Sequence, residues 1–319
     1  MRSRYFKGSN HLRSALAIFV CLVAAAAVFA QVRKPTNYRA ITIVTEPSST
    51  VWIDGVRYGV TDDKGRLSIA TVSPGVRSIR VRANGFSEVT KSLPAASRGD
   101  VEIKLTKTTD EAELAFQSAE SMTTVDRQKA IAGYENAIKL RPKYPEAYLG
   151  LTRMFSETGD LEKADKAIRA AKRLRPGYGE ASAVEGRLLK DTGEEEKAIA
   201  TFKRAITESK GFQPEAYTGL GLLYKDRAEN SGGSGEYDQE TANYEQAAKY
   251  FAVAVKQLGG APDGIVVYQL LGLIYERQKK FQEAIALYEE FLRVFPDTSE
   301  AGAVASFIVQ IKKQMAEPK

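Results

Sequence analysis

The sequence predicts a multidomain all-β plus all-α protein, in which a small antiparallel β-sandwich is followed by an α-helical solenoid. Two different hydrophobic periods predict this division. Between residues 38 and 105, apolar side chains alternate with polar ones, as they do in strands that bury one face. From residue 111 onward the apolar side chains recur at helical spacing, and the pattern repeats every 34 residues.

Residues 1–30 have the composition of a secretory signal peptide. Basic residues are followed by the sixteen-residue apolar run Ala15 to Ala30, which ends in small side chains. This pattern predicts cleavage after Ala30 and an exported protein, periplasmic or secreted. The alternative is an uncleaved anchor that tethers the protein to the membrane, although sixteen residues fall short of the ~20 that a spanning helix needs.

The sequence argues against catalysis. The only histidine, His11, and the only cysteine, Cys21, both lie in the leader, so the chain after residue 30 contains neither. This excludes disulfides, thiol nucleophiles, Cys/His zinc sites and His-dependent triads from that part of the chain. We find no paired acids, Gly-rich phosphate loop or metal-ligand spacing, and therefore expect no enzyme and no cofactor. A carboxylate-dependent enzyme is the least favoured alternative.

Charge is divided unevenly along the chain. The total is +6, residues 31–107 carry 13 Lys/Arg against 7 Asp/Glu, and residues 108–319 carry a net −4. The basic N-terminal module could contact a cell-wall polymer or an anionic membrane surface. Scattered, solvated charges are the favoured explanation. Export and a nearly neutral charge after removal of the leader argue against nucleic acid as a partner.

Residues 31–107 resemble a PEGA domain. The resemblance rests on VTEPSSTVWIDG at 44–55, Gly59-Val60-Thr61, Ser73-Pro74-Gly75 and IRVRANGF at 79–86, although Pro47 is followed by Ser-Ser-Thr and the tetrapeptide that names the family is absent. Residues 61–86 also resemble carboxypeptidase regulatory-like modules, which remain the alternative. Either resemblance implies a non-catalytic accessory β module of an exported protein, and PEGA domains are bacterial and archaeal.

Three residues of this module allow a sharper interpretation. Trp52 is out of phase with Val51 and Ile53, so it is either an exposed anchor for a sugar or partner, or an aromatic that packs at a sheet edge. Asp62 and Asp63 are either calcium ligands or, as we favour, solvated turn formers.

Residues 108–298 resemble an array of about five tetratricopeptide repeats. Small and large apolar positions recur at the family's 34-residue period, as in Ala130/Ala164/Ala198, Tyr134/Ile168/Phe202 and Ala137/Ala171/Ala205. We place the repeats at 111–144, 145–178, 179–213, 214–264 and 265–298, and a C-terminal capping helix and tail at 299–319. Asp110 is the expected N-cap of the first helix. The resemblance implies a protein-binding scaffold.

The fourth repeat is longer than the others. Its extra residues at 229–243, ENSGGSGEYDQETAN, are rich in Gly, Ser and acidic side chains and predict a mobile loop insertion. We interpret it as a tolerated insertion; the alternative is a functional loop that reaches over the groove.

In tetratricopeptide repeats the first helix of each pair lines the concave face. Carried onto this sequence, that rule places mixed apolar and charged residues in a groove that could receive a peptide with acidic residues. The alternative is a solvated face that binds no peptide. The candidate partner-binding residues are Glu146, Leu149, Arg153, Arg187, Lys190, Leu222, Lys225, Gln269 and Leu273.

The favoured hypothesis is an exported, non-catalytic scaffold or adaptor that binds a protein partner in the cell envelope through its repeat array. The alternative is an accessory protein that binds a cell-wall or surface polymer through the basic β module. The two hypotheses differ in which part of the chain is sufficient for binding.

Overall fold

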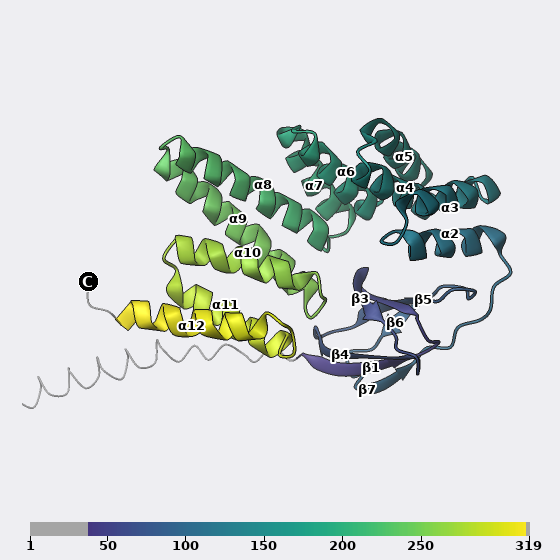
Figure 1. Ribbon diagram of the computed structural model, residues 1–319, viewed down its shortest axis with the longest axis horizontal. Helices are drawn as coiled ribbons and strands as arrows, with labels where there is room; N and C mark the ends of the chain where they lie inside the picture. The colour runs from purple at the N-terminus through teal and green to yellow at the C-terminus, as the bar shows by residue number, and fades with distance from the viewer. Residues whose placement is uncertain (1–37, 317–319) are drawn as a thin grey trace, which may run out of the picture. The chain divides into compact units, whose positions relative to one another are not determined.

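The computed structural model describes residues 38–316 (Figure 1). The predicted signal peptide and its cleavage site lie outside the described residues. Over the described part, the chain forms seven strands and then eleven helices, so the predicted order of β and α parts is confirmed. None of these helices is both long and apolar enough to cross a membrane.

The β module consists of two sheets. One has the order β4 (Arg66–Val72), β1 (Arg39–Val44), β7 (Gly99–Glu102). The other has the order β3 (Val56–Val60), β2 (Thr50–Ile53), β5 (Arg77–Arg82), β6 (Val89–Leu93). All strand pairs are antiparallel except β1 with β7, which is parallel.

The predicted alternation fills the space between the sheets. Its buried side chains share one cluster: Ile41, Ile43, Val51, Ile53, Ile69, Val72, Ile79, Val81, Leu93 and Ile103. Asp62 closes the turn between β3 and β4, where its Oδ1 accepts hydrogen bonds from the Lys64 N–H at 2.9 Å and the Arg66 N–H at 2.8 Å. This geometry makes Asp62 a turn former. Within residues 38–316, no group of acidic, His or Cys side chains is arranged to hold a metal ion.

The helices from α2 to α11 follow one another as antiparallel pairs. Asp110, Asp126 and Asp160 cap α2, α3 and α5 with their side chains, and Pro145 and Pro214 occupy the first turns of α4 and α8. The bounds are α2 (Glu111–Met122), α3 (Arg127–Leu140), α4 (Pro145–Glu157), α5 (Leu161–Leu174), α6 (Gly179–Asp191), α7 (Glu195–Glu208), α8 (Pro214–Gly233), α9 (Tyr237–Leu258), α10 (Gly264–Arg277), α11 (Phe281–Val294) and α12 (Ala301–Ala316).

Close helix crossings depend on glycine. A glycine on the first helix of a pair faces an aromatic ring on the second, and a Cβ added to that glycine would approach the ring too closely. The pairs are Gly186 with Phe202 at 2.6 Å, Gly221 with Phe251 at 2.6 Å, and Gly272 with Tyr288 at 2.4 Å. The absence of a side chain on one helix therefore lets the large side chain of the other fill the crossing.

The prediction of a loop at 229–243 is wrong. α8 continues to Gly233 and α9 begins at Tyr237, so only Ser234–Glu236 connect them. The extra residues lengthen both helices, which contact each other along this length, as at Gly232 and Glu240. The extra residues are exposed or half-buried, whereas Ala228 and Tyr244 on either side of them are buried in the core. Packing against a partner helix outweighs the low helix propensity of Gly and Ser.

We predict that Gly221→Ala lowers the free energy of unfolding by about 1–3 kcal/mol, since its methyl group overpacks the crossing at Phe251. The control is Gly302→Ala in α12, which meets no atom within 4 Å and should raise stability by about 0.5–1 kcal/mol. Urea unfolding of both variants measures the difference. Equal changes in unfolding free energy in the two variants would show that Phe251 does not require a glycine at position 221.

Acid sensitivity should arise partly at the helix caps. The hydrogen bond from the Lys129 N–H lowers the pKa of Asp126, and the ammonium and N–H of Lys163 lower the pKa of Asp160. Stability from a carboxylate with a lowered pKa is present above its unfolded pKa of about 4 and is lost as the pH falls through the folded value. An Asp126→Asn, Asp160→Asn variant keeps both caps, so its melting temperature should fall less than the wild type's between pH 5 and 2. If the melting temperatures of the variant and the wild type fall equally between pH 5 and 2, the two caps do not cause the acid sensitivity.

Candidate protein-binding site

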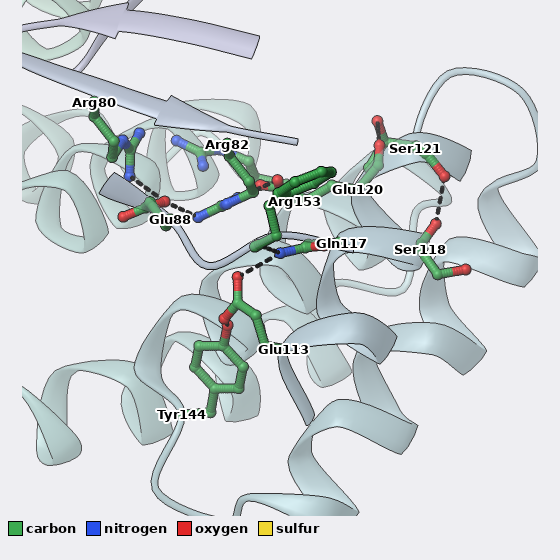
Figure 2. A network of polar contacts seen from close by, with 12 residues as sticks. Arg80, Arg82, Glu88, Glu113, Gln117, Ser118, Glu120, Ser121, Tyr144 and Arg153 are labelled. Carbon is green, nitrogen blue, oxygen red and sulfur yellow. Dashed lines mark hydrogen bonds and ion pairs between the residues drawn. The ribbon is translucent and has the colours of Figure 1, made fainter. Parts of the chain in front are cut away.

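The β module is joined to the first helix of the array by a network of polar contacts (Figure 2). Gln117 on α2 accepts a hydrogen bond from the Gly85 N–H at 2.9 Å and donates one to the Phe86 carbonyl at 2.7 Å. The same amide donates to Glu113 at 2.9 Å, and Glu113 accepts from the Tyr144 hydroxyl at 2.6 Å. The turn after β5 is thus held by α2, which is held in turn by the start of α4.

Arg82 is the central residue of this contact. The Arg82 side chain is only 9% exposed, and its guanidinium forms ion pairs with Glu88 of the β module and Glu120 of α2. It also lies 4.6 Å from the centroid of the Phe116 ring and 5.4 Å from that of Trp52. Burial lowers the pKa of Arg82, but the two carboxylates raise it by more, so the side chain stays charged.

A second contact joins the β module to the later repeats. The Tyr58 hydroxyl donates to the Leu258 carbonyl at 3.3 Å, and the Tyr38 hydroxyl donates to Glu290 at 3.1 Å. Gly260 approaches Thr71 so closely that an added Cβ would lie 1.8 Å from the threonine Oγ1. Contacts at both ends of the array therefore fix the β module over the helices between them.

Two hollows lie between the β module and the helices. The first, of about 780 Å³, is lined by the β2–β3 hairpin and by the first helices of successive repeats. The second, of about 720 Å³, is lined by β2, β3, β5 and helices α2, α3, α4 and α6. They share five wall residues, Trp52, Arg57, Arg153, Tyr178 and Glu180. We call the two adjoining hollows the roofed groove.

Six of the nine predicted site residues border the roofed groove. Arg153, Arg187, Lys190 and Leu222 line the first hollow, and Glu146, Leu149 and Arg153 line the second. Lys225, Gln269 and Leu273 border neither hollow. Gln269 and Leu273 are exposed on α10, whereas Lys225 pairs with Glu229 on its own helix at 2.7 Å. The positional rule for first helices thus places most, but not all, of these residues together.

The structure does not place Leu149 where a partner could contact it, contrary to the prediction. Its side chain is 2% exposed and belongs to a core cluster with Ile168, Ala181 and Val184. It supports the wall of the groove from beneath and offers almost no surface to a partner. Leu149 is buried because its position on α4 faces the next repeat as well as the groove, and Ala181 and Val184 of that repeat cover it.

Arg153 also has a role that the sequence did not suggest. It pairs with Glu180 on α6 at 3.1 Å and with Glu215 on α8 at 3.4 Å. Burial lowers its pKa, but these two carboxylates raise it by more, and the guanidinium stays charged. Arg153 therefore joins three successive repeats, and its charge is already balanced within the chain.

Sequence reasoning missed the contribution of the β module to the groove. Trp52 packs beneath the Arg80 guanidinium, 4.3 Å from the ring centroid, and lines both hollows, so it is a packing residue that borders the groove. The pair Gly259-Gly260 was the one available signal, because adjacent glycines at a helix end are typical of a close backbone approach. That signal indicates a contact but not its partner.

We predict that Arg82→Gln lowers the free energy of unfolding by about 2–3 kcal/mol. This is less than the ~3–5 kcal/mol of a fully buried pair, because Glu88 and Glu120 keep some solvent contact. The control is Arg66→Gln, which breaks the exposed pair with Asp100 and should cost under about 1 kcal/mol. Chemical denaturation measures the free energy of unfolding of both variants. Similar losses of stability in the two would contradict the role of Arg82 in joining the β module to α2.

Tetratricopeptide-repeat families match residues 126–179, 180–211 and 266–298. No curated protein matches the chain. Among solved structures, yeast Tom70 has a TM-score of 0.51 at 17% identity, and the match covers 65% of this chain and 41% of Tom70. The MamA protein has a TM-score of 0.41 at 21% identity, with coverage of 60% and 96%. Pseudomonas aeruginosa pilF has a TM-score of 0.46 at 15% identity, with coverage of 64% and 91%.

The family matches agree with the geometry of the helix pairs. Each matched segment begins and ends close to the bounds of described helices, and the structural similarity to Tom70 extends over about two thirds of the chain. At 17% identity the similarity to Tom70 shows the fold alone. Residues 126–211 and 266–298 are therefore tetratricopeptide repeats, in a helical solenoid that follows a two-sheet β module.

Proposed function

We propose that this protein is a non-catalytic scaffold of the bacterial cell envelope, which binds a segment of a partner protein in the roofed groove. Tetratricopeptide repeats support a role in protein–protein interaction. The observation that carries the proposal is the first hollow, of about 780 Å³, in which residues from the first helices of several repeats converge. A hollow of this size accommodates several side chains of a bound segment.

The sequence is what supports a location in the cell envelope. A basic, then apolar leader supports export, and the lack of His and Cys after residue 30 suits a protein that folds without disulfides. The PEGA-like segments and the two-sheet architecture of residues 39–102 support an accessory module typical of exported proteins. A retained leader would tether the same scaffold to the membrane.

The polymer-binding alternative has less support. Several basic side chains of the β module are already paired with carboxylates: Arg66 with Asp100, Arg77 with Asp54, and Arg82 with Glu88 and Glu120. Such pairs reduce the attraction of the module for an anionic surface. The groove therefore provides the better-defined site.

The test is crosslinking in the envelope fraction with an Arg187→Glu, Lys190→Glu variant. Both side chains line the first hollow and neither joins three repeats as Arg153 does. We expect recovery of the crosslinked partner to fall at least about fivefold, roughly 1 kcal/mol of binding free energy.

The matched control is Lys139→Glu, Lys203→Glu, which reverses two exposed charges on the second helices α3 and α7. It should recover the partner as the wild type does. Equal recovery by both double variants would remove the groove from the proposal. Full-length protein found only in the cytosol would contradict export.

A further inference from the structure

We propose that Arg57 on β3 binds a carboxylate of an extended peptide segment seated in the roofed groove. The β module would then supply the residue that selects the partner, while the repeats supply the surrounding walls. This inference rests on the proposed function, and it names both the partner chemistry and the selecting residue.

The first observation is the position of Arg57. It lies in the β2–β3 hairpin, opposite Trp52 in the strand register, and is one of the five residues that border both hollows. Its side chain is exposed. A ligand that extends from one hollow into the other passes between these five residues, and Arg57 is one of them.

The second observation is the distribution of charge. Every other cationic side chain that lines either hollow has a carboxylate partner: Arg80 with Glu88, Arg82 with Glu88 and Glu120, Arg127 with Glu157, Arg153 with Glu180 and Glu215, Arg187 with Glu215, and Lys190 with Asp191. Within residues 38–316, Arg57 has neither an ion pair nor a side-chain hydrogen bond. It is the cation left available for a ligand, in a fork geometry that fits a carboxylate.

The same distribution indicates a singly charged group rather than a phosphate. Asp54, Glu180 and Glu215 in the walls are already paired with arginines. Asp263 also lines the first hollow, has no ion pair within residues 38–316, and disfavours a ligand with several negative charges. One free guanidinium beside paired charges complements one carboxylate. An Asp or Glu side chain in a peptide supplies that charge.

The third observation is the strand that carries Arg57. β3 is an edge strand of its sheet, and within the described part of the chain Val56–Val60 form backbone hydrogen bonds with β2 only. An edge strand favours a ligand in extended conformation, since its free N–H and C=O groups can pair with another backbone. Val266 on α10, 53% exposed, adds an apolar wall to the first hollow. The fitting ligand is an extended segment with an acidic residue flanked by apolar ones.

The test selects binders from a random decapeptide library displayed on phage, using the full chain as wild type, Arg57→Gln, Arg57→Lys and Lys64→Gln. Lys64 is the matched control because it lies exposed in the β3–β4 turn of the same module and borders neither hollow. Selected peptides are then compared with their Glu→Gln and Asp→Asn counterparts by fluorescence anisotropy.

We expect wild type and Lys64→Gln to select peptides with one acidic residue at a fixed position, and to bind the neutral counterparts about tenfold more weakly. Arg57→Gln should lose this discrimination, and Arg57→Lys should keep part of it. Peptides bound equally well by wild type and Arg57→Gln would overturn the role of Arg57 while leaving the scaffold function intact. A wild type that selects no peptide would also overturn this inference, whereas the scaffold function is judged by its own crosslinking test.

Discussion

The arrangement of the site depends on the ion pairs of Arg82. A guanidinium that is only 9% exposed is stable only where carboxylates compensate for its lost hydration, and here one carboxylate comes from each side of the contact. Glu88 belongs to the β module and Glu120 to α2. Since both are needed, the buried charge specifies how the module meets the first helix.

A single contact of this kind would leave the β module free to pivot. The approach of Gly260 to Thr71 and the hydrogen bond from Tyr58 to Leu258 supply a second contact, at the far end of the array. Between them the β2–β3 hairpin is held over the helices, and the groove exists before any partner binds. A preformed groove reduces the ordering cost of association, so a partner with few contacts can still bind. The arginine that joins three repeats, Arg153, adds to this rigidity from below.

Local signals predicted the local structure well. The change of period separated the β and α parts, and the predicted cap at Asp110 correctly located the start of the first helix. The loop predicted at 229–243 failed because its composition describes isolated backbone, whereas α8 and α9 stabilise each other over their added length.

The site was predicted less well, for a related reason. The first-helix rule placed Arg187 and Lys190 in a groove, and both line the first hollow. It could not show that Leu149 is covered by the next repeat or that Arg153 is neutralised by Glu180 and Glu215. Nor does any local pattern state that the β2–β3 hairpin lies over these helices. These contacts join residues that are 27 to 200 positions apart, and a single sequence does not record which distant segments meet.

The β module is fixed over the repeats at both ends. An ideal Cβ at position 260 lies 3.1 Å from the Thr71 Cβ, so the two positions need to separate only slightly to reach the roughly 3.5–4.5 Å of a disulfide. In a Cys21→Ser background, Thr71→Cys combined with Gly260→Cys should therefore form an intramolecular disulfide on mild oxidation, detected by loss of both free thiols. The matched pair Thr71→Cys with Gly302→Cys should remain reduced. Two thiols that stay equally reactive in both pairs would contradict the fixed arrangement.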